Sequence, residues 1–118
     1  MKFNFVSLTV ENLEKAKNFY IELLGKEPVH SSERLVKFRY GEMQFSLYNP
    51  EADGSNNREV VYGNNSIPAF EVKDLESERE RIGRIADVES GYELNDHRGF
   101  FVKDPSGNLI EIYEMTGI

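Results

Sequence analysis

The chain has 118 residues, and its 39% hydrophobic content, with six Tyr and eight Phe, is enough to build the core of one domain. Its 21 acidic and 14 basic residues give a net charge of −7, which argues against a nucleic-acid partner because the phosphates would be repelled. Cysteine is absent, which excludes disulfides, thiolate nucleophiles and zinc-finger sites, and no apolar run is long enough to cross a membrane, so we expect a cytoplasmic protein without membrane partners.

Residues 1–50 predict a strand, a helix and three further strands. Residues 3–10 alternate as in a strand, with Val6, Leu8 and Val10 on a face in an apolar core and a face of mixed character that carries Phe3, Phe5, Ser7 and Thr9. Asn12 suits an N-cap, an apolar pattern at helical spacing runs from Leu13 to Leu24, and Gly25 ends the helix. Strands are then expected at three places: 29–31, 35–40 and 43–49.

Residues 51–65 separate this first module from a second one at 66–118. From Pro50 to Ser66 the sequence is polar and rich in Gly and Asn, with only an apolar triplet at 60–62 to interrupt it. This composition is typical of a solvated connection, and a mobile flap is the alternative. We therefore expect one domain, 1–118, in which a linker joins two modules.

The second module repeats the organisation of the first. The chain carries Val10-Glu11-Asn12-Leu13-Glu14 and, 72 − 10 = 62 residues later, Val72-Lys73-Asp74-Leu75-Glu76. In each copy a strand ends, an Asn or Asp caps, and a Leu opens a helix. We expect a strand at 67–72, which Pro68 makes an edge strand or locally irregular, a helix that ends or bends at Gly83, and a strand within 85–95.

A β-hairpin closes the second module. Its turn is Asp104-Pro105-Ser106-Gly107-Asn108, in which Pro presets φ and Gly accepts a positive φ. The strand that follows alternates, with Ile110 and Ile112 on a core face and Leu109, Glu111 and Tyr113 on the other. The Glu111 carboxylate therefore lines a binding cavity, or is held by Arg39 or Arg98, or faces solvent.

These motifs together resemble the vicinal oxygen chelate superfamily, which includes glyoxalase I, fosfomycin-resistance proteins, extradiol dioxygenases and bleomycin-resistance proteins. The resemblance rests on the two strand–helix–three-strand units, the repeated junctions, Asn18-Phe19-Tyr20 with Leu24-Gly25, and the segment 103–111. It covers essentially the whole chain. It implies an α+β fold in which two βαβββ modules form a curved mixed sheet around a cavity, and a homodimer that completes this cavity.

The resemblance also implies where a metal would bind in the metalloenzymes of that family. His, Gln and Glu side chains project there from the first and last strands of each module, and the matching positions here are Phe5, Ser46, Ile67 and Glu111. A divalent cation needs at least three protein ligands, and only Glu111 is of a metal-binding type. We therefore expect no metal and no other cofactor.

A cavity in that position would be apolar and aromatic with few polar points. His30 and His97 are both interpreted as ordinary surface or loop residues, and His97, at the mouth of the cavity, is the better functional candidate of the two. A filled interior without a cavity is the alternative interpretation. The candidate ligand-binding residues are Phe5, Ser7, Arg39, Ser46, Tyr48, Ile67, His97, Glu111 and Tyr113, with Phe3 and Leu109 adding apolar surface.

Three functions remain open from the sequence. The first is a metal-free small-molecule-binding protein of the bleomycin-resistance type, which sequesters an aromatic or cationic ligand through stacking and charge. The second is an enzyme of the same superfamily, a lyase, isomerase or dioxygenase, that uses Glu111 with a divalent metal or as a general base. The third is a structural or regulatory module whose cavity is filled.

Overall fold

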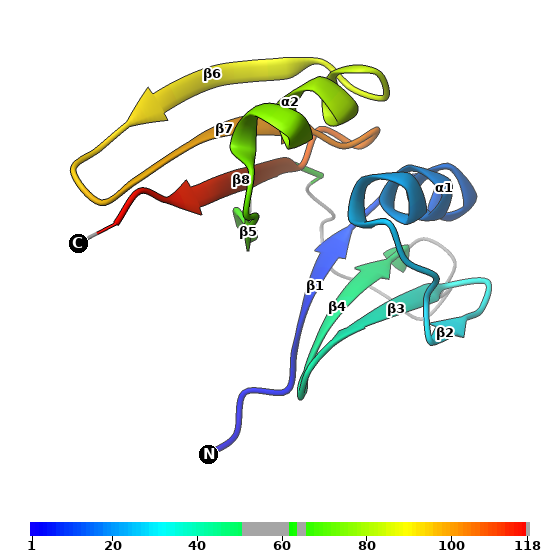
Figure 1. Cartoon of the computed structure of the whole chain (residues 1–118). Coiled ribbons are helices and arrows are strands. Elements are labelled where there is room, and N and C mark those ends of the chain that lie inside the picture. Colours follow the sequence, from blue (N-terminus) through cyan, green and yellow to red (C-terminus); the bar gives the residue numbers. More distant parts are fainter. Residues whose placement is uncertain (51–61, 64–65, 118) are drawn as a thin grey trace.

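The computed structural model describes residues 1–50, 62–63 and 66–117. It contains two four-stranded sheets, one in each module, and one helix beside each sheet (Figure 1). The elements of the first module are β1 (Phe5–Thr9), α1 (Leu13–Leu24), β2 (His30–Ser31), β3 (Leu35–Tyr40) and β4 (Met43–Tyr48). Those of the second are β5 (Ala69–Glu71), α2 (Leu75–Gly83), β6 (Val88–Glu93), β7 (His97–Lys103) and β8 (Leu109–Met115).

The two sheets have the same topology, which confirms the repeat and the α+β fold class. Their strand orders are β1-β4-β3-β2 and β5-β8-β7-β6, with the first strand of each module parallel to the last and the other pairs antiparallel. The strand expected at 67–72 is shorter than predicted, at 69–71, so that it begins after Pro68, and it lies at the edge of its sheet, one of the two arrangements expected from this proline. Each four-stranded sheet is therefore formed by the strands of one module alone.

Both helices begin as the repeated junctions predict. The side chain of Asn12 accepts from the backbone N–H of Lys15, and that of Asp74 accepts from Ser77, so each satisfies one of the unpaired amides of a first turn. Gly25 ends α1 in the left-handed conformation with a φ of 68°. The capping residues thus set the register of the apolar face that each helix turns toward its sheet.

A further carboxylate, that of Glu114, supports the start of α2. It accepts from the backbone N–H of Leu75 at 2.7 Å and from Arg98 Nε at 2.8 Å. These two contacts hold the pKa of Glu114 below its usual range. The last strand of the second module thereby fixes where its helix begins.

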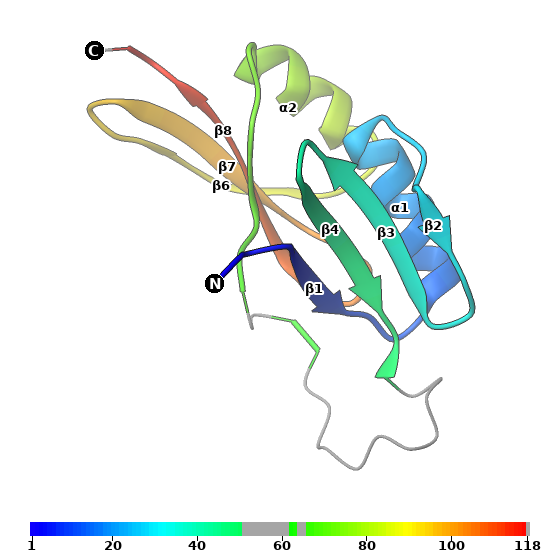
Figure 2. The ribbon, with the colours of Figure 1, turned by 90° about the horizontal axis from the view of Figure 1, so that it is seen from below.

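The modules meet through their helix-bearing sides. Phe45 on β4 and Phe70 on β5 each lie on the side of their sheet that carries the helix, and their rings contact edge to face at 5.7 Å. Arg81 on α2 donates to the carbonyls of Glu22 and Leu23 at the end of α1, at 2.9 and 2.8 Å. In Figures 1 and 2, the two helices accordingly lie near each other on the inner side of the molecule.

The hairpin turn of the second module is anchored on the first by the buried carboxylate of Asp104. This carboxylate accepts from the Tyr20 hydroxyl at 2.7 Å, from the Ser106 amide at 2.9 Å and from the backbone and side-chain amides of Asn108 at 2.8 and 2.9 Å. The Asn108 side chain also donates to the carbonyl of Thr9 at the end of β1. Burial and the Asp104 charge raise the pKa of Tyr20, so this phenol stays a donor.

The expected linker and the absence of a membrane-spanning segment are the two remaining predictions about the fold. The predicted linker or flap at 51–65 lies outside the described residues, apart from Tyr62 and Gly63. Within the described ranges, neither helix is long and apolar enough to cross a membrane.

Replacing Asp104 by Ala is expected to destabilise the protein by about 3–4 kcal/mol, because four donors, in three buried hydrogen bonds and one part-buried one, lose their acceptor together. Tyr20→Phe removes only one of these hydrogen bonds and is expected to cost about 1–2 kcal/mol. Urea unfolding of the three proteins measures both differences.

Asp87→Ala is the matched control, since Asp87 is an exposed carboxylate in the same module and its loss is expected to change stability by less than about 0.5 kcal/mol. A result in which Asp104→Ala costs no more than Tyr20→Phe would contradict the anchoring role of this carboxylate.

Candidate functional site

The candidate site residues lie on the sheet faces that no described helix covers, which we call the outer faces. Phe5, Ser7, Ser46, Tyr48 and Arg39 lie on the outer face of the first sheet. Glu111, Tyr113 and His97 lie on that of the second, with Ile67 just before β5. The modules meet through their opposite sides, so within one chain these two groups are held on different faces. The four positions matched to the family's metal ligands are split in the same way.

On the second sheet, Glu111 is held by a tyrosine. The hydroxyl of Tyr92 on β6 donates a hydrogen bond to Glu111 Oε2 on β8. Of the two arginines considered as partners, Arg98 pairs instead with Glu114 and Arg39 lies on the other sheet. Burial, the hydrogen bond and the Glu111 charge raise the pKa of Tyr92 well above its ordinary value, so the phenol remains a donor.

A glycine makes this contact possible. Tyr92 and Gly99 are register partners on β6 and β7, and Glu111 lies on the next strand, so the tyrosine ring must pass over Gly99 to reach it. A Cβ at position 99 would lie 2.8 Å from the Tyr92 hydroxyl and 2.5 Å from the carbonyl oxygen of Ile112. Only glycine therefore fits at position 99 while the Tyr92 ring lies over it and reaches Glu111.

Aromatic rings surround the Tyr92–Glu111 pair. The centroid of the Tyr92 ring lies 5.5 Å from that of His97 and 5.8 Å from that of Phe101. The His97 centroid lies 5.9 Å from that of Tyr113. His97 Nδ1 lies 2.7 Å from Asp96, and this hydrogen bond holds the pKa of Asp96 below its usual range. The site thus presents one carboxylate and one imidazole set among aromatic surfaces.

Sequence reasoning missed Tyr92 and Phe101. Tyr92 falls in the segment where only a strand was expected, and its partner is 19 residues away on a strand that is not its neighbour. One signal was available, because an isolated Gly inside a strand indicates a close approach of another group. Gly99 was that residue.

The outer face of the first sheet has a different character. Phe5 is 57% exposed, whereas Ser46, directly beside Ser7 on β1 and Lys37 on β3, is only 1% exposed. Within the described residues, Ser46 Oγ has no hydrogen-bond partner. Arg39 extends the same face on β3, opposite Gln44 on β4.

The donor set at the family's metal positions does not fit a divalent cation. Phe5 and Ile67 offer no ligand atom, Ser46 offers only a neutral hydroxyl, which is a poor ligand, and Ser46 and Glu111 of one chain lie on different sheets. One oxygen of Glu111 is already engaged by Tyr92. In the described ranges, no three His, Cys, Asp or Glu side chains converge on one point. We therefore derive no chemistry through a metal at these positions.

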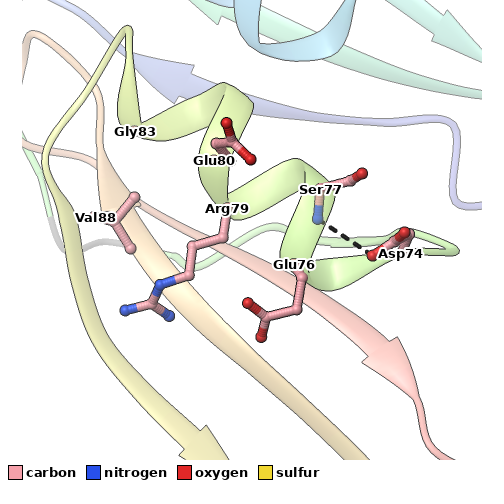
Figure 3. A pocket seen from close by; sticks show the side chains of 7 residues that line it. All are labelled: Asp74, Glu76, Ser77, Arg79, Glu80, Gly83 and Val88. Carbon is pink, nitrogen blue, oxygen red and sulfur yellow. Dashed lines mark hydrogen bonds between the residues drawn. The ribbon is translucent and has the colours of Figure 1, made fainter.

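A hollow between α2 and β6 lies away from both outer faces (Figure 3). Its rim carries Asp74, Glu76 and Glu80, and the guanidinium of Arg79 lies 5.5 Å from the ring of buried Phe100. This arginine packs on the helix-bearing side of the sheet and shields its core. None of the residues predicted to bind a ligand lines the hollow.

Comparison with known proteins identifies the fold independently. A sequence model described as the Glyoxalase/Bleomycin resistance protein/Dioxygenase superfamily matches residues 2–112. A trivalent organoarsenical cleaving enzyme from Bacillus sp. (strain MD1) is 27% identical over 119 aligned positions, covering 96% of this chain and 73% of that protein.

Solved structures agree with this match. The lactoylglutathione lyase from Agrobacterium tumefaciens superposes with a TM-score of 0.76 at 22% identity, over 96% of this chain and 92% of that one. A glyoxalase/bleomycin resistance protein from Albidiferax ferrireducens superposes with a TM-score of 0.72 at 21% identity, over 95% and 97%. At these identities the structures establish the fold alone.

Glu111→Gln is expected to lower the pKa of Tyr92 toward its ordinary value, because it removes the negative charge that disfavours the phenolate. Tyr92 holds its proton more tightly when folded, so its contribution to stability is present below about pH 10 and is lost as the pH rises. Titration of ¹³Cζ-labelled tyrosine by NMR measures the pKa directly.

The control is Glu93→Gln, which removes a carboxylate adjacent to Tyr92 in sequence but on the opposite face of β6. It is expected to leave the Tyr92 titration unchanged. An equal shift in both variants would show that general charge, and not the Glu111 contact, sets this pKa.

Proposed function

The chain belongs to the glyoxalase/bleomycin resistance protein/dioxygenase superfamily, and from this premise we propose that it is a metal-free protein that binds an aromatic or cationic small molecule. The observation that carries the proposal is the Tyr92–Glu111 pair set among aromatic rings on the outer face of the second sheet. Binding there would sequester the ligand without transforming it.

The chemistry of this face favours an organic cation with an apolar body. Tyr92 engages Oε2 of Glu111, which leaves Oε1 to meet a positively charged group. The rings of Tyr92, His97 and Tyr113 offer faces and edges on which a flat ligand stacks, and a cation over such a ring gains about 0.5–2 kcal/mol. Charge and stacking thus act on the same ligand.

A homodimer would enclose this site. Each outer face exposes apolar side chains without a helix to cover them, since Phe5, Ile67 and Met115 are 57%, 50% and 51% exposed. Exposed apolar surface of this kind commonly marks an interface. We propose that the outer face of the first sheet of one copy covers the outer face of the second sheet of another, so that the ligand binds between them.

The second candidate function is an enzyme of the same superfamily with Glu111 as a general base. Two similar proteins favour it, since the names of the Bacillus and Agrobacterium proteins describe a cleaving enzyme and a lyase. In this chain the Tyr92 hydroxyl could return a proton that Glu111 removes. Arsenic(III) prefers soft thiolate ligands, and this sequence has no cysteine to supply them. The arsenical substrate of the Bacillus enzyme is therefore not part of the proposal for this chain.

Benzyltrimethylammonium is expected to raise the melting temperature and to bind measurably by calorimetry, whereas its neutral counterpart benzyl alcohol binds less tightly. Glu111→Gln is expected to weaken binding of the cation by about tenfold and to leave benzyl alcohol unaffected. Glu93→Gln serves as the control with the same loss of charge.

Metal analysis of protein purified without chelator tests whether the protein is metal-free. Stoichiometric metal that disappears in Glu111→Ala would overturn the metal-free proposal in favour of a metal-dependent enzyme. No response to any aromatic or cationic compound would remove the binding function and leave a structural role.

Light scattering during size-exclusion chromatography is expected to show a dimer. Phe5→Glu should shift the protein toward the monomer, because a buried charge would then oppose the interface. Val29→Glu is the control, since Val29 is 54% exposed beside the edge strand β2. A stable monomer at micromolar concentration would contradict the enclosed site.

A further inference from the structure

Hydrogen-bond donors form a row across the outer face of the first sheet. Ser7 on β1, Ser46 on β4 and Lys37 on β3 are register partners, so their side chains lie side by side across three adjacent strands. His30 on β2 is the register partner of Lys37 and extends the row to the sheet edge. Arg39, two residues from Lys37 on β3, adds a second fixed cation.

Acidic residues are absent from this face in the described strands. The alternating residues of β1, β3 and β4 that share it include Phe5, Thr9, Leu35, Gln44 and Tyr48, and none of these is a carboxylate. Within the described residues, neither Lys37 nor Arg39 forms an ion pair. The face is therefore positively charged in a chain whose net charge is −7.

The buried hydroxyl of Ser46 is the feature of the row that indicates a bound ligand. Ser46 is 1% exposed, and its Oγ lacks a partner among the described residues, whereas buried hydroxyls are almost always hydrogen-bonded. Ser46 lies between a second hydroxyl and an ammonium group. A donor left unsatisfied at that point is what an anionic oxygen would satisfy.

We propose that this row is an anion-binding subsite that takes a carboxylate or phosphate group of a small molecule. Lys37 and Arg39 on β3 supply the charge, and Ser46 and Ser7 on the neighbouring strands β4 and β1 supply hydroxyl donors beside Lys37. Phe5 and Tyr48 lie on either side of the row along their strands and would contact an apolar body attached to the acid.

The inference rests on the proposed function in one respect, namely that ligands bind on the outer faces. In the proposed dimer, the donor row of one copy would lie opposite Glu111 of the other. The enclosed space would then suit a ligand with an acidic group at one end and a cationic or aromatic group at the other.

To test the subsite, the 118-residue protein is titrated with benzoate and, separately, with inorganic phosphate at constant ionic strength. Calorimetry measures the affinity, and the amide NMR shifts of Ser7 and Ser46 show whether the anion binds at the row. Lys37→Gln is expected to weaken binding of the preferred anion at least about fivefold. Ser46→Ala should weaken it while leaving stability unchanged or higher, because the hydroxyl has no partner to lose. The tighter of the two anions identifies the ligand class.

Lys15→Gln is the matched control, because it removes one positive charge from the exposed side of α1. Equal weakening in Lys15→Gln and Lys37→Gln would reduce the effect to general electrostatics and overturn the subsite. Loss of the dimer in Lys37→Gln without weaker anion binding would overturn it too, since the row would then pair with acidic residues of the second copy.

The outcomes separate this inference from the proposed function. Anion binding at the row without benzyltrimethylammonium binding at Glu111 would support the subsite and refute the proposed cation site. Cation binding that depends on Glu111, with no anion bound at the row, would do the reverse.

Discussion

The structure depends on one buried carboxylate, that of Asp104. It turns the hairpin of the second module by accepting from Ser106 and Asn108, and it joins that hairpin to the first module through Tyr20. An isolated buried charge is costly, so its four donors stabilise it as much as it positions them. Because the turn is fixed against α1 and β1, the strand that follows it is fixed too. The site at Glu111, seven residues further on, inherits this placement.

The sequence predicts the fold well because its signals are local and occur twice. Asn12 and Asp74 cap their helices, Gly25 ends the first, and the alternation of Ile110 and Ile112 with Glu111 sets the faces of the last strand. The site is predicted less completely. Glu111 and His97 are candidates that the sequence offers, yet the contact of Glu111 with Tyr92 joins non-adjacent strands across Gly99, and no spacing along the chain encodes such a diagonal. The burial of Ser46 likewise depends on three strands together.

The two outer faces differ in chemistry although the modules that carry them share a topology. On the second sheet, a carboxylate and aromatic rings favour cations, whereas on the first, hydroxyls and two cationic side chains favour anions. Two modules with the same fold thus present surfaces with opposite charge preferences. This is possible because side chains on the helix-free sides of the sheets contribute little to the core and can differ between the modules. Selection at these positions can act on binding with little effect on folding.

The pairing of the first strand with the last in each module has a consequence for how the chain can be divided. Each of the described strands β1 to β8 pairs only within its own half, so strand register places no demand on the length of the connection at 51–65. The halves are held together by contacts of side chains, among them Tyr20 with Asp104, Phe45 with Phe70, and Arg81 with the end of α1. These contacts do not require a continuous backbone, so the two halves are suited to fragment complementation from separate chains.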